Sequence, residues 1–141
     1  MTALEKLMND QYTTQGQLLS ALMLHEVFLA LEPPRGDNPL HAAPLRQNNG
    51  SGDFVLVAAS LRAAELLGLA LSSKGTVSPY THMGRLKILP LVLERYQDIG
   101  IQLIGRSSTG NSFNTILIEA DTIADIRTDA EQLAETHKQE V

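Results

Sequence analysis

The chain contains no cysteine and no tryptophan, and only 4% of its 141 residues are aromatic. Without cysteine it cannot form a disulfide, a thiolate zinc site or a thiol nucleophile, which fits a reducing compartment. Long apolar runs are missing too: residues 18–31, the longest, contain Ser20, His25 and Glu26 and are too short and polar to span a bilayer. These absences exclude cysteine-dependent functions and predict a protein without a membrane span.

Basic residues are also few. The chain has 11 Lys and Arg against 16 Asp and Glu, which gives a formal net charge of -5. Nucleic acids and anionic membranes are bound through clustered Lys and Arg, and the basic residues here are scattered, so we expect neither partner. Residues 1–10 lack the basic start and apolar core of a signal peptide, so we expect a cytoplasmic protein.

What the chain does contain is two strand-to-helix units. An apolar run at 54–59 ends at Ser60 and continues into a helical pattern, and a second run from Thr115 ends at Asp121 before a helical pattern at 122–137. The length suits one domain with its own core. The pattern predicts a single α+β domain, 1–141, with a mixed or antiparallel sheet packed by an N-terminal helical segment and a C-terminal helix.

The N-terminal segment predicts two helices. Thr2 and Glu5 have the spacing of a capping box, and Thr13 or Thr14 precedes a longer helix that we expect to continue to about residue 31. Apolar residues widen the stripe of this helix, so it is either wrapped by the domain or shared with another chain. The candidate interface residues on the stripe are Leu18, Leu22, His25, Phe28 and Leu29.

The middle of the chain is rich in turn-forming residues. Proline and glycine recur through about 32–53, which predicts a long loop of the kind that is usually functional or disordered. Gly68 is a natural cap for the helix that starts at 61, and residues 69–71 are either a short strand or the end of that helix. Further on, the pattern predicts a helix at about 89–98 and a strand at 101–104, with an antiparallel partner at 113–119 after a turn.

Residues with catalytic or metal-binding potential are isolated along the sequence. The four histidines lie far apart, so we predict no metal site and no cofactor, and His25 is expected to be a hydrogen-bonded core residue. Ser60 follows a strand, where α/β proteins often place functional groups, but a helix N-cap explains it. No nucleophile motif of the Gly-x-Ser-x-Gly type is present, which favours a non-enzymatic protein.

The loop at 105–111 is the most site-like segment. Its hydroxyls, backbone donors and single arginine are typical of loops that cradle phosphate. It lacks the lysine and the following helix of a P-loop, and its position between two strand patterns is also what a hairpin requires. The candidate ligand-binding residues are Arg106, Ser107, Ser108, Thr109 and Asn111.

The order of elements after Gly52 resembles the N-terminal domain of the SseB (enhanced serine sensitivity) family. The residues that carry the resemblance are the strand at 54–60, Ile88-Leu-Pro90, the strand near a glycine at 100–104 and the final strand at 115–118. The resemblance implies a small α+β module tied to bacterial secretion or protein interaction. It brings no catalytic residues.

Two functions follow as hypotheses. The first is a non-enzymatic bacterial protein-interaction module, secretion-associated and of the chaperone or immunity-protein kind, whose partner is another protein or a second copy of the chain. The alternative is a small-ligand or phosphate-binding protein, with enzymes included, that uses the loop at 105–111. Replacing Arg106 by alanine separates them, because a ligand site would lose a charge-assisted hydrogen bond.

Overall fold

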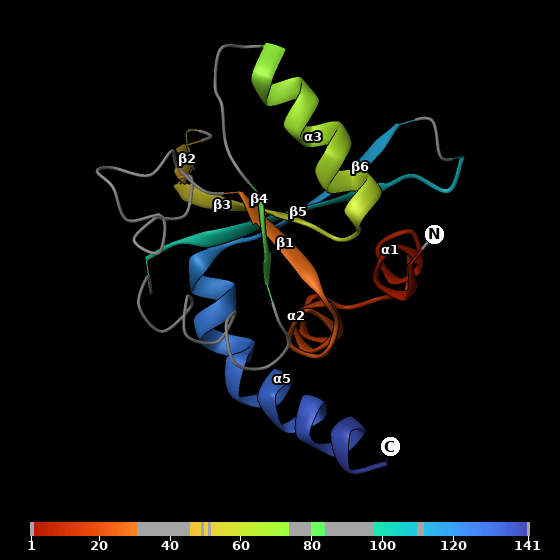
Figure 1. Cartoon of the computed structure of the whole chain (residues 1–141). Coiled ribbons are helices and arrows are strands. Elements are labelled where there is room, and N and C mark those ends of the chain that lie inside the picture. Colours follow the sequence, from red (N-terminus) through yellow and green to blue (C-terminus); the bar gives the residue numbers. More distant parts are fainter. Residues whose placement is uncertain are drawn as a thin grey trace.

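The chain folds around one mixed β-sheet, shown in the computed structural model of Figure 1. The structure describes residues 2–30, 46–48, 50, 52–73, 80–83, 98–109 and 112–140. Within these residues the sheet has six strands in the order β4-β1-β3-β5-β6, and β2 pairs with β3 off this path. The strands are β1 (Val27–Ala30), β2 (Arg46–Asn48), β3 (Asp53–Ala58), β4 (Tyr80–Met83), β5 (Gly100–Arg106) and β6 (Phe113–Ile118).

The central strand β3 has neighbours of both kinds. It runs parallel to β5, with Val55 opposite Ile101. Its other edge is shared by β2 and β1, both antiparallel to it. β6 is antiparallel to β5 and β4 is antiparallel to β1, so these two strands end the sheet in the described part of the chain.

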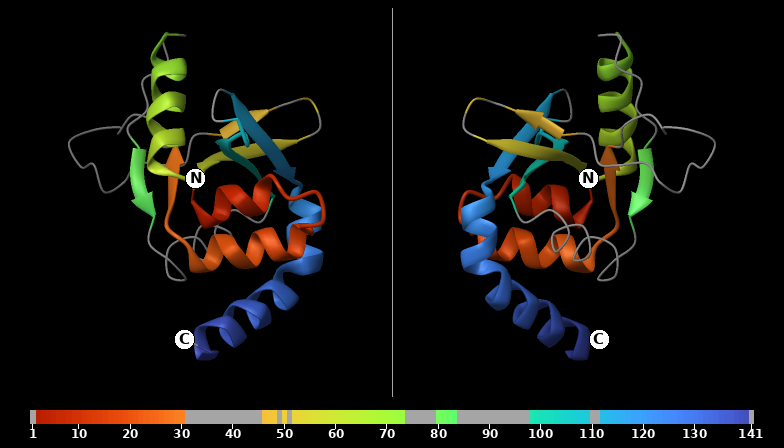
Figure 2. Two further views of the ribbon diagram at one scale, coloured as in Figure 1. Left: turned by 90° about the vertical axis from the view of Figure 1, so that its right-hand side faces the viewer. Right: turned by 90° about the vertical axis from the view of Figure 1, so that its left-hand side faces the viewer.

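Helices cover both faces of the sheet (Figures 1 and 2). On one face lies α3 (Leu61–Ser73), and on the other lie α1 (Ala3–Met8), α2 (Gln15–Leu24) and α5 (Ala120–Glu140). Val55 and Val57 of β3 belong to the apolar cluster that includes α1, α2 and α5 residues, while Leu56 packs with Leu67 of α3. The central strand is apolar on both faces because helices bury both of them. The predicted α+β class is therefore confirmed.

Several local predictions are confirmed. Thr2 and Glu5 form the capping box of α1, in which the Glu5 N–H donates to Thr2 Oγ1 at 3.2 Å and the Thr2 N–H donates to Glu5 Oε1 at 3.1 Å. Thr14 caps α2 in the same way. Ser60 caps α3, since the Ala63 N–H donates to Ser60 Oγ at 3.1 Å. The predicted strands at 101–104 and 113–119 form the antiparallel pair of β5 and β6.

The predicted long helix up to residue 31 is wrong. α2 ends at Leu24, His25 has extended backbone with φ of -99° and ψ of 158°, and β1 follows at once. Periodicity could not place this boundary because a continuous apolar run suits a helix and a strand buried on both faces equally well. Hydrogen bonding to β3 and β4 favours a strand over a helix at residues 27–30. Val27 and Phe28 also suit a strand, in which β-branched and aromatic residues are common.

Gly68 does not end α3, which continues to Ser73 and so confirms that residues 69–71 are the end of this helix; a glycine inside a helix costs only about 1 kcal/mol relative to alanine. Two further predictions change. α5 begins at Ala120, ahead of the expected start at 122. Residues 46–48 of the predicted loop form β2, which pairs with β3. The rest of that loop up to 45, and the predicted helix at about 89–98 except Asp98, lie outside the described residues.

Candidate functional site

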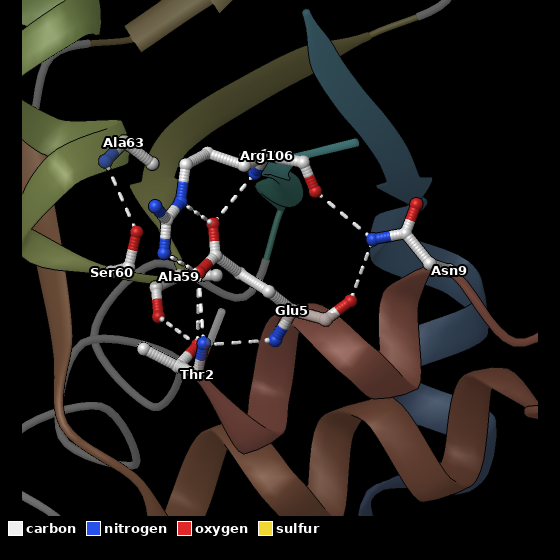
Figure 3. Close-up of polar contacts among 7 residues, drawn as sticks. All are labelled: Thr2, Glu5, Asn9, Ala59, Ser60, Ala63 and Arg106. Carbon is white, nitrogen blue, oxygen red and sulfur yellow. Dashed lines mark hydrogen bonds and ion pairs between the residues drawn. The ribbon is translucent and has the colours of Figure 1, made fainter. Parts of the chain in front are cut away.

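The carboxyl ends of the parallel strands β3 and β5 hold the most connected polar cluster in the described chain (Figure 3). The carboxylate of Glu5, on α1, is fully buried there. Glu5 Oε2 accepts hydrogen bonds from the backbone N–H of Arg106 at 2.7 Å and from Arg106 Nε at 3.1 Å. Glu5 Oε1 accepts one from Arg106 Nη2 at 3.1 Å. Glu5 and Arg106 therefore form a bidentate ion pair, and the backbone N–H of Arg106 in β5 adds a third hydrogen bond to the carboxylate.

The surroundings keep this ion pair charged. Burial by itself would raise the pKa of Glu5, but hydrogen bonds from the side chain and backbone of Arg106, from the Thr2 backbone and from the Ser60 side chain lower that pKa to about 2. The hydrogen bond to Glu5 raises the pKa of Arg106. A carboxylate that accepts several hydrogen bonds is stabilised in its ionised form even when buried.

The cluster fastens α1 to the sheet. Thr2 Oγ1 donates to the carbonyl of Ala59, just after β3, at 3.2 Å. Asn9 Nδ2 donates both to the carbonyl of Glu5 at 2.8 Å and to the carbonyl of Arg106 at 2.9 Å. In α/β sheets, ligands bind beyond the carboxyl ends of parallel strands. Here α1 occupies that position beside β5, and its glutamate satisfies the arginine.

The predicted ligand loop is organised as a hairpin. The Ser107 N–H donates to the Ser112 carbonyl at 2.8 Å, Ser112 Oγ donates to Ser107 Oγ at 3.0 Å, and Ser107 Oγ lies 2.9 Å from Thr109 Oγ1. Ser108 is exposed in the turn. The hydroxyls of Ser107 and Thr109 come together. The guanidinium of Arg106 is paired with Glu5 (Figure 3). Asn111 lies outside the described residues, and ligand binding by this loop stays a prediction.

The predicted interface residues do not form one exposed stripe. Leu18, Leu22 and Leu29 are buried in the main apolar cluster, on α2 and β1. The expectation that His25 is a core residue is wrong, since His25 is only half-buried where α2 ends and β1 follows. Phe28 packs against the small cluster that includes Ala63 and Ala64 of α3. These positions mostly build the core.

A groove of about 660 Å³ lies beside the first residues of α1 and α3. His25 and Phe28 line it together with Leu24, Ser60 and Leu61, while the hydroxyl of Ser60 serves as the cap of α3. His25 also lines a second, smaller and mostly apolar pocket of about 380 Å³ between α2 and α5. No group of three or more His, Asp or Glu side chains in the described chain is placed to hold a metal ion.

Sequence reasoning predicted the strand β6 but did not place it at an edge of the sheet. Within the described residues β6 pairs on one side only, with β5. Because Ser107 and Ser112 form a hydrogen-bonded pair and such pairs recur at every second residue, Asn114, Ile116 and Ile118 direct their backbone groups toward β5. The backbone groups of Phe113, Thr115 and Leu117 therefore point outward. A hydrogen bond supports this orientation of Leu117, since Gln15 Nε2 donates to its outward carbonyl at 3.3 Å.

The side chains of β6 make this edge apolar. Phe113 and Leu117 are each 39% exposed, and Thr115 between them is exposed too. No residue of the strand carries a charge. The sequence holds no signal that marks this strand as an edge, because edge strands usually carry charge or proline and β6 carries neither.

Comparisons with known proteins give no match: no family model, no curated protein and no solved structure matches the chain. In the described residues, no helix has both the length and the apolar character needed to cross a membrane.

Proposed function

We propose that the chain is a non-enzymatic protein-interaction module that binds its partner through the edge of β6. The observation that carries the proposal is an uncharged edge strand, Phe113–Ile118, with two half-exposed apolar side chains and outward-facing backbone groups. An edge strand of this kind is a template to which another strand adds, since backbone hydrogen bonds supply affinity and alternate side chains supply specificity.

Proteins that must avoid edge pairing usually modify their edges. They place lysine or proline on the strand, interrupt it with a bulge, or keep it very short. β6 carries no lysine and no proline, and its register with β5 runs without interruption from Phe113 to Ile118. The strand itself thus carries none of these protective features, which supports a role in binding.

The polar cluster at the carboxyl ends of β3 and β5 also supports a binding role over a catalytic one. Glu5 and Arg106 neutralise each other and hold α1 against β5, and Ser60 caps α3. A general acid or base needs a pKa near the working pH, whereas the pKa of Glu5 is about 2. The cluster is better suited to a structural role.

The proposal agrees with what the resemblance to the SseB family implies. On that basis we assign the module to a bacterial cytoplasm, in a secretion-associated role of the chaperone or immunity-protein kind. Partners would then meet β6 as an extended segment of protein.

A capture experiment tests the proposal. Tagged wild-type protein, Thr115→Lys and Thr128→Lys serve as baits in lysate of the source cell, with captured proteins identified by mass spectrometry and rebound in purified form. Thr115 and Thr128 are both exposed, the first on β6 and the second on α5, so both variants should fold and carry the same added charge. We expect Thr128→Lys to retain the partner and Thr115→Lys to lose it.

If purified partners bind the wild type, Thr115→Lys and Thr128→Lys with the same affinity, β6 is not the contact surface and the proposal fails.

A further inference from the structure

We infer that the strand which adds to β6 is β6 of a second copy of the chain, antiparallel to the first and related to it by a two-fold axis at Thr115. The inference rests on the proposed function and names its partner. The result is a symmetric dimer in which the two sheets join into one.

The geometry of the edge suits a two-fold axis. In an antiparallel pair, two residues that face each other form two N–H···O hydrogen bonds when the backbone groups of both point toward the neighbouring strand. Centring the pair on Thr115 places Thr115 opposite Thr115 of the partner subunit, and Phe113 opposite the partner subunit's Leu117. All three residues direct their backbone groups outward, so each outward donor meets an outward acceptor. A two-fold interface must be complementary to itself, and this strand is.

The side chains match in the same register. Phe113, Thr115 and Leu117 share one exposed face of β6 because side chains alternate along a strand. Across the axis, phenylalanine would lie beside leucine at both ends, and threonine would lie beside threonine in the centre. Thr–Thr pairs are among the favourable cross-strand neighbours, and phenylalanine beside leucine buries apolar surface of both side chains. The two half-exposed apolar side chains would therefore become covered.

The lack of charge on β6 permits pairing with a second copy of the same strand. The chain carries a formal net charge of -5, so two copies repel each other as whole molecules, but pairing through β6 brings no like charges of this strand together. β6 has no charged residue, and in β5 the one charged residue, Arg106, is paired with Glu5. A basic partner attracted to this acidic chain would find no carboxylate within β6. The strand suits a partner that also presents an uncharged surface.

One contact would have to change on assembly. The exposed side chain of Gln15 donates to the carbonyl of Leu117 at 3.3 Å, and that carbonyl would accept from the partner subunit's Phe113 instead. An exposed hydrogen bond of this length contributes little, because water replaces it readily. The exchange therefore opposes the dimer only weakly.

The test measures mass in solution by sedimentation at several concentrations. The wild type should reach twice the chain mass of 15.4 kDa. Thr115→Lys places two like charges opposite each other at the axis, so its dimer dissociation constant should rise at least tenfold. Thr115→Val keeps a β-branched, uncharged residue and should remain dimeric, as should Thr128→Lys, whose charge lies on α5.

A cysteine variant tests the register and does not depend on the charged variant. The chain has no cysteine, so a single introduced thiol reports one contact. In the proposed register the two copies of residue 115 have Cα atoms about 5.5 Å apart, within disulfide range, whereas the two copies of residue 112 are roughly 20 Å apart. Under oxidation Thr115→Cys should form a covalent dimer, and Ser112→Cys should not.

A wild type that stays at 15.4 kDa at every concentration, with no cross-linking at residue 115, overturns the inference. So does a dimer that persists unchanged in a folded Thr115→Lys protein. If the wild type is monomeric but Thr115→Lys still loses a lysate protein that Thr128→Lys retains, the proposed function stands and only the second copy is wrong. If a folded Thr115→Lys protein differs from the wild type neither in mass nor in any captured partner, both proposals fail.

Discussion

At the scale of single residues, the fold depends most visibly on Glu5 and Arg106. A fully buried carboxylate is costly unless it is paired, and here the guanidinium and backbone of Arg106 supply the pairing. The pair joins residues that are 101 positions apart in the chain. Its contribution can be measured because it depends on the ionised form of Glu5.

Acid should weaken the fold through Glu5. The pKa of Glu5 is about 2 in the folded chain, below its ordinary value of 4.5, so the folded state binds this proton less readily than the unfolded state. Its contribution to stability is complete above about pH 4.5 and is lost as the pH falls toward 2, a change of about 3 kcal/mol. Urea unfolding measured across this range should show the loss.

The control for this experiment is Glu5→Gln, which removes the titrating group and should flatten that part of the pH profile. If the wild type and Glu5→Gln lose stability in parallel between pH 4.5 and 2, other carboxylates are responsible and the assigned role of Glu5 is wrong.

Arg106→Ala should destabilise the chain, because it leaves the buried carboxylate of Glu5 without its cation. The matched control is Arg127→Ala, which removes a surface pair with Glu131 at i,i+4 spacing and should have little effect. Thermal unfolding compares the two variants. Equal melting temperatures for both would contradict the structural role of Arg106 and would return attention to ligand binding by the loop at 105–111.

At the scale of elements, close packing between strands leaves some positions without room for a side chain. A Cβ atom at Gly100, the first residue of β5, would lie 2.6 Å from the backbone carbonyl of Ile118. The carbonyl belongs to β6 and cannot move without disturbing the ladder. Gly100→Ala should therefore cost about 1–3 kcal/mol of unfolding free energy.

Gly16→Ala is the matched control in α2. The nearest atom to a Cβ there is Thr14 Oγ1 at 3.9 Å, so alanine fits. Because alanine favours helix more than glycine does, this variant should gain about 0.5–1 kcal/mol. Denaturant unfolding measures the unfolding free energy of both variants. A change in the same direction for Gly100→Ala and Gly16→Ala would contradict the packing argument.

Leu22→Glu distinguishes core from interface in α2. Leu22 has no exposed surface, so an introduced carboxylate would be buried without a partner and should unfold the domain. Leu133→Glu, at a position that is 43% exposed on α5, should stay folded. Circular dichroism separates these outcomes. A folded Leu22→Glu protein with altered mass would restore the original hypothesis that α2 is an interface.

The sequence predicted those elements that depend on interactions between residues close together in the chain. The capping box at Thr2 and the cap at Ser60 involve residues three positions apart, and the hairpin after β5 needs only a turn, so all were predictable. The boundary between α2 and β1 was not, because pairing with distant strands decides it. The ion pair of Glu5 with Arg106 was hidden for the same reason.

At the scale of the whole molecule, the two strands that end the sheet among the described residues differ in character. β4, at one end, has only the four residues from Tyr80 to Met83. β6, at the other, is longer and uncharged, and it exposes Phe113 and Leu117 beside outward backbone groups. Helices bury both faces of the central strand, which leaves the edges of the sheet for assembly. Of the two end strands, β6 offers the longer uncharged edge for an added strand.

The central claim is that the outward edge of β6 pairs with another strand, and residue-resolved amide hydrogen exchange tests it most directly. The amides of Asn114, Ile116 and Ile118 point toward β5 and should be protected at every concentration. Those of Phe113, Thr115 and Leu117 should be protected in concentrated wild-type protein and should lose protection on dilution or in Thr115→Lys. Rapid exchange of these three amides at every concentration, with the inward three still protected, would contradict the account.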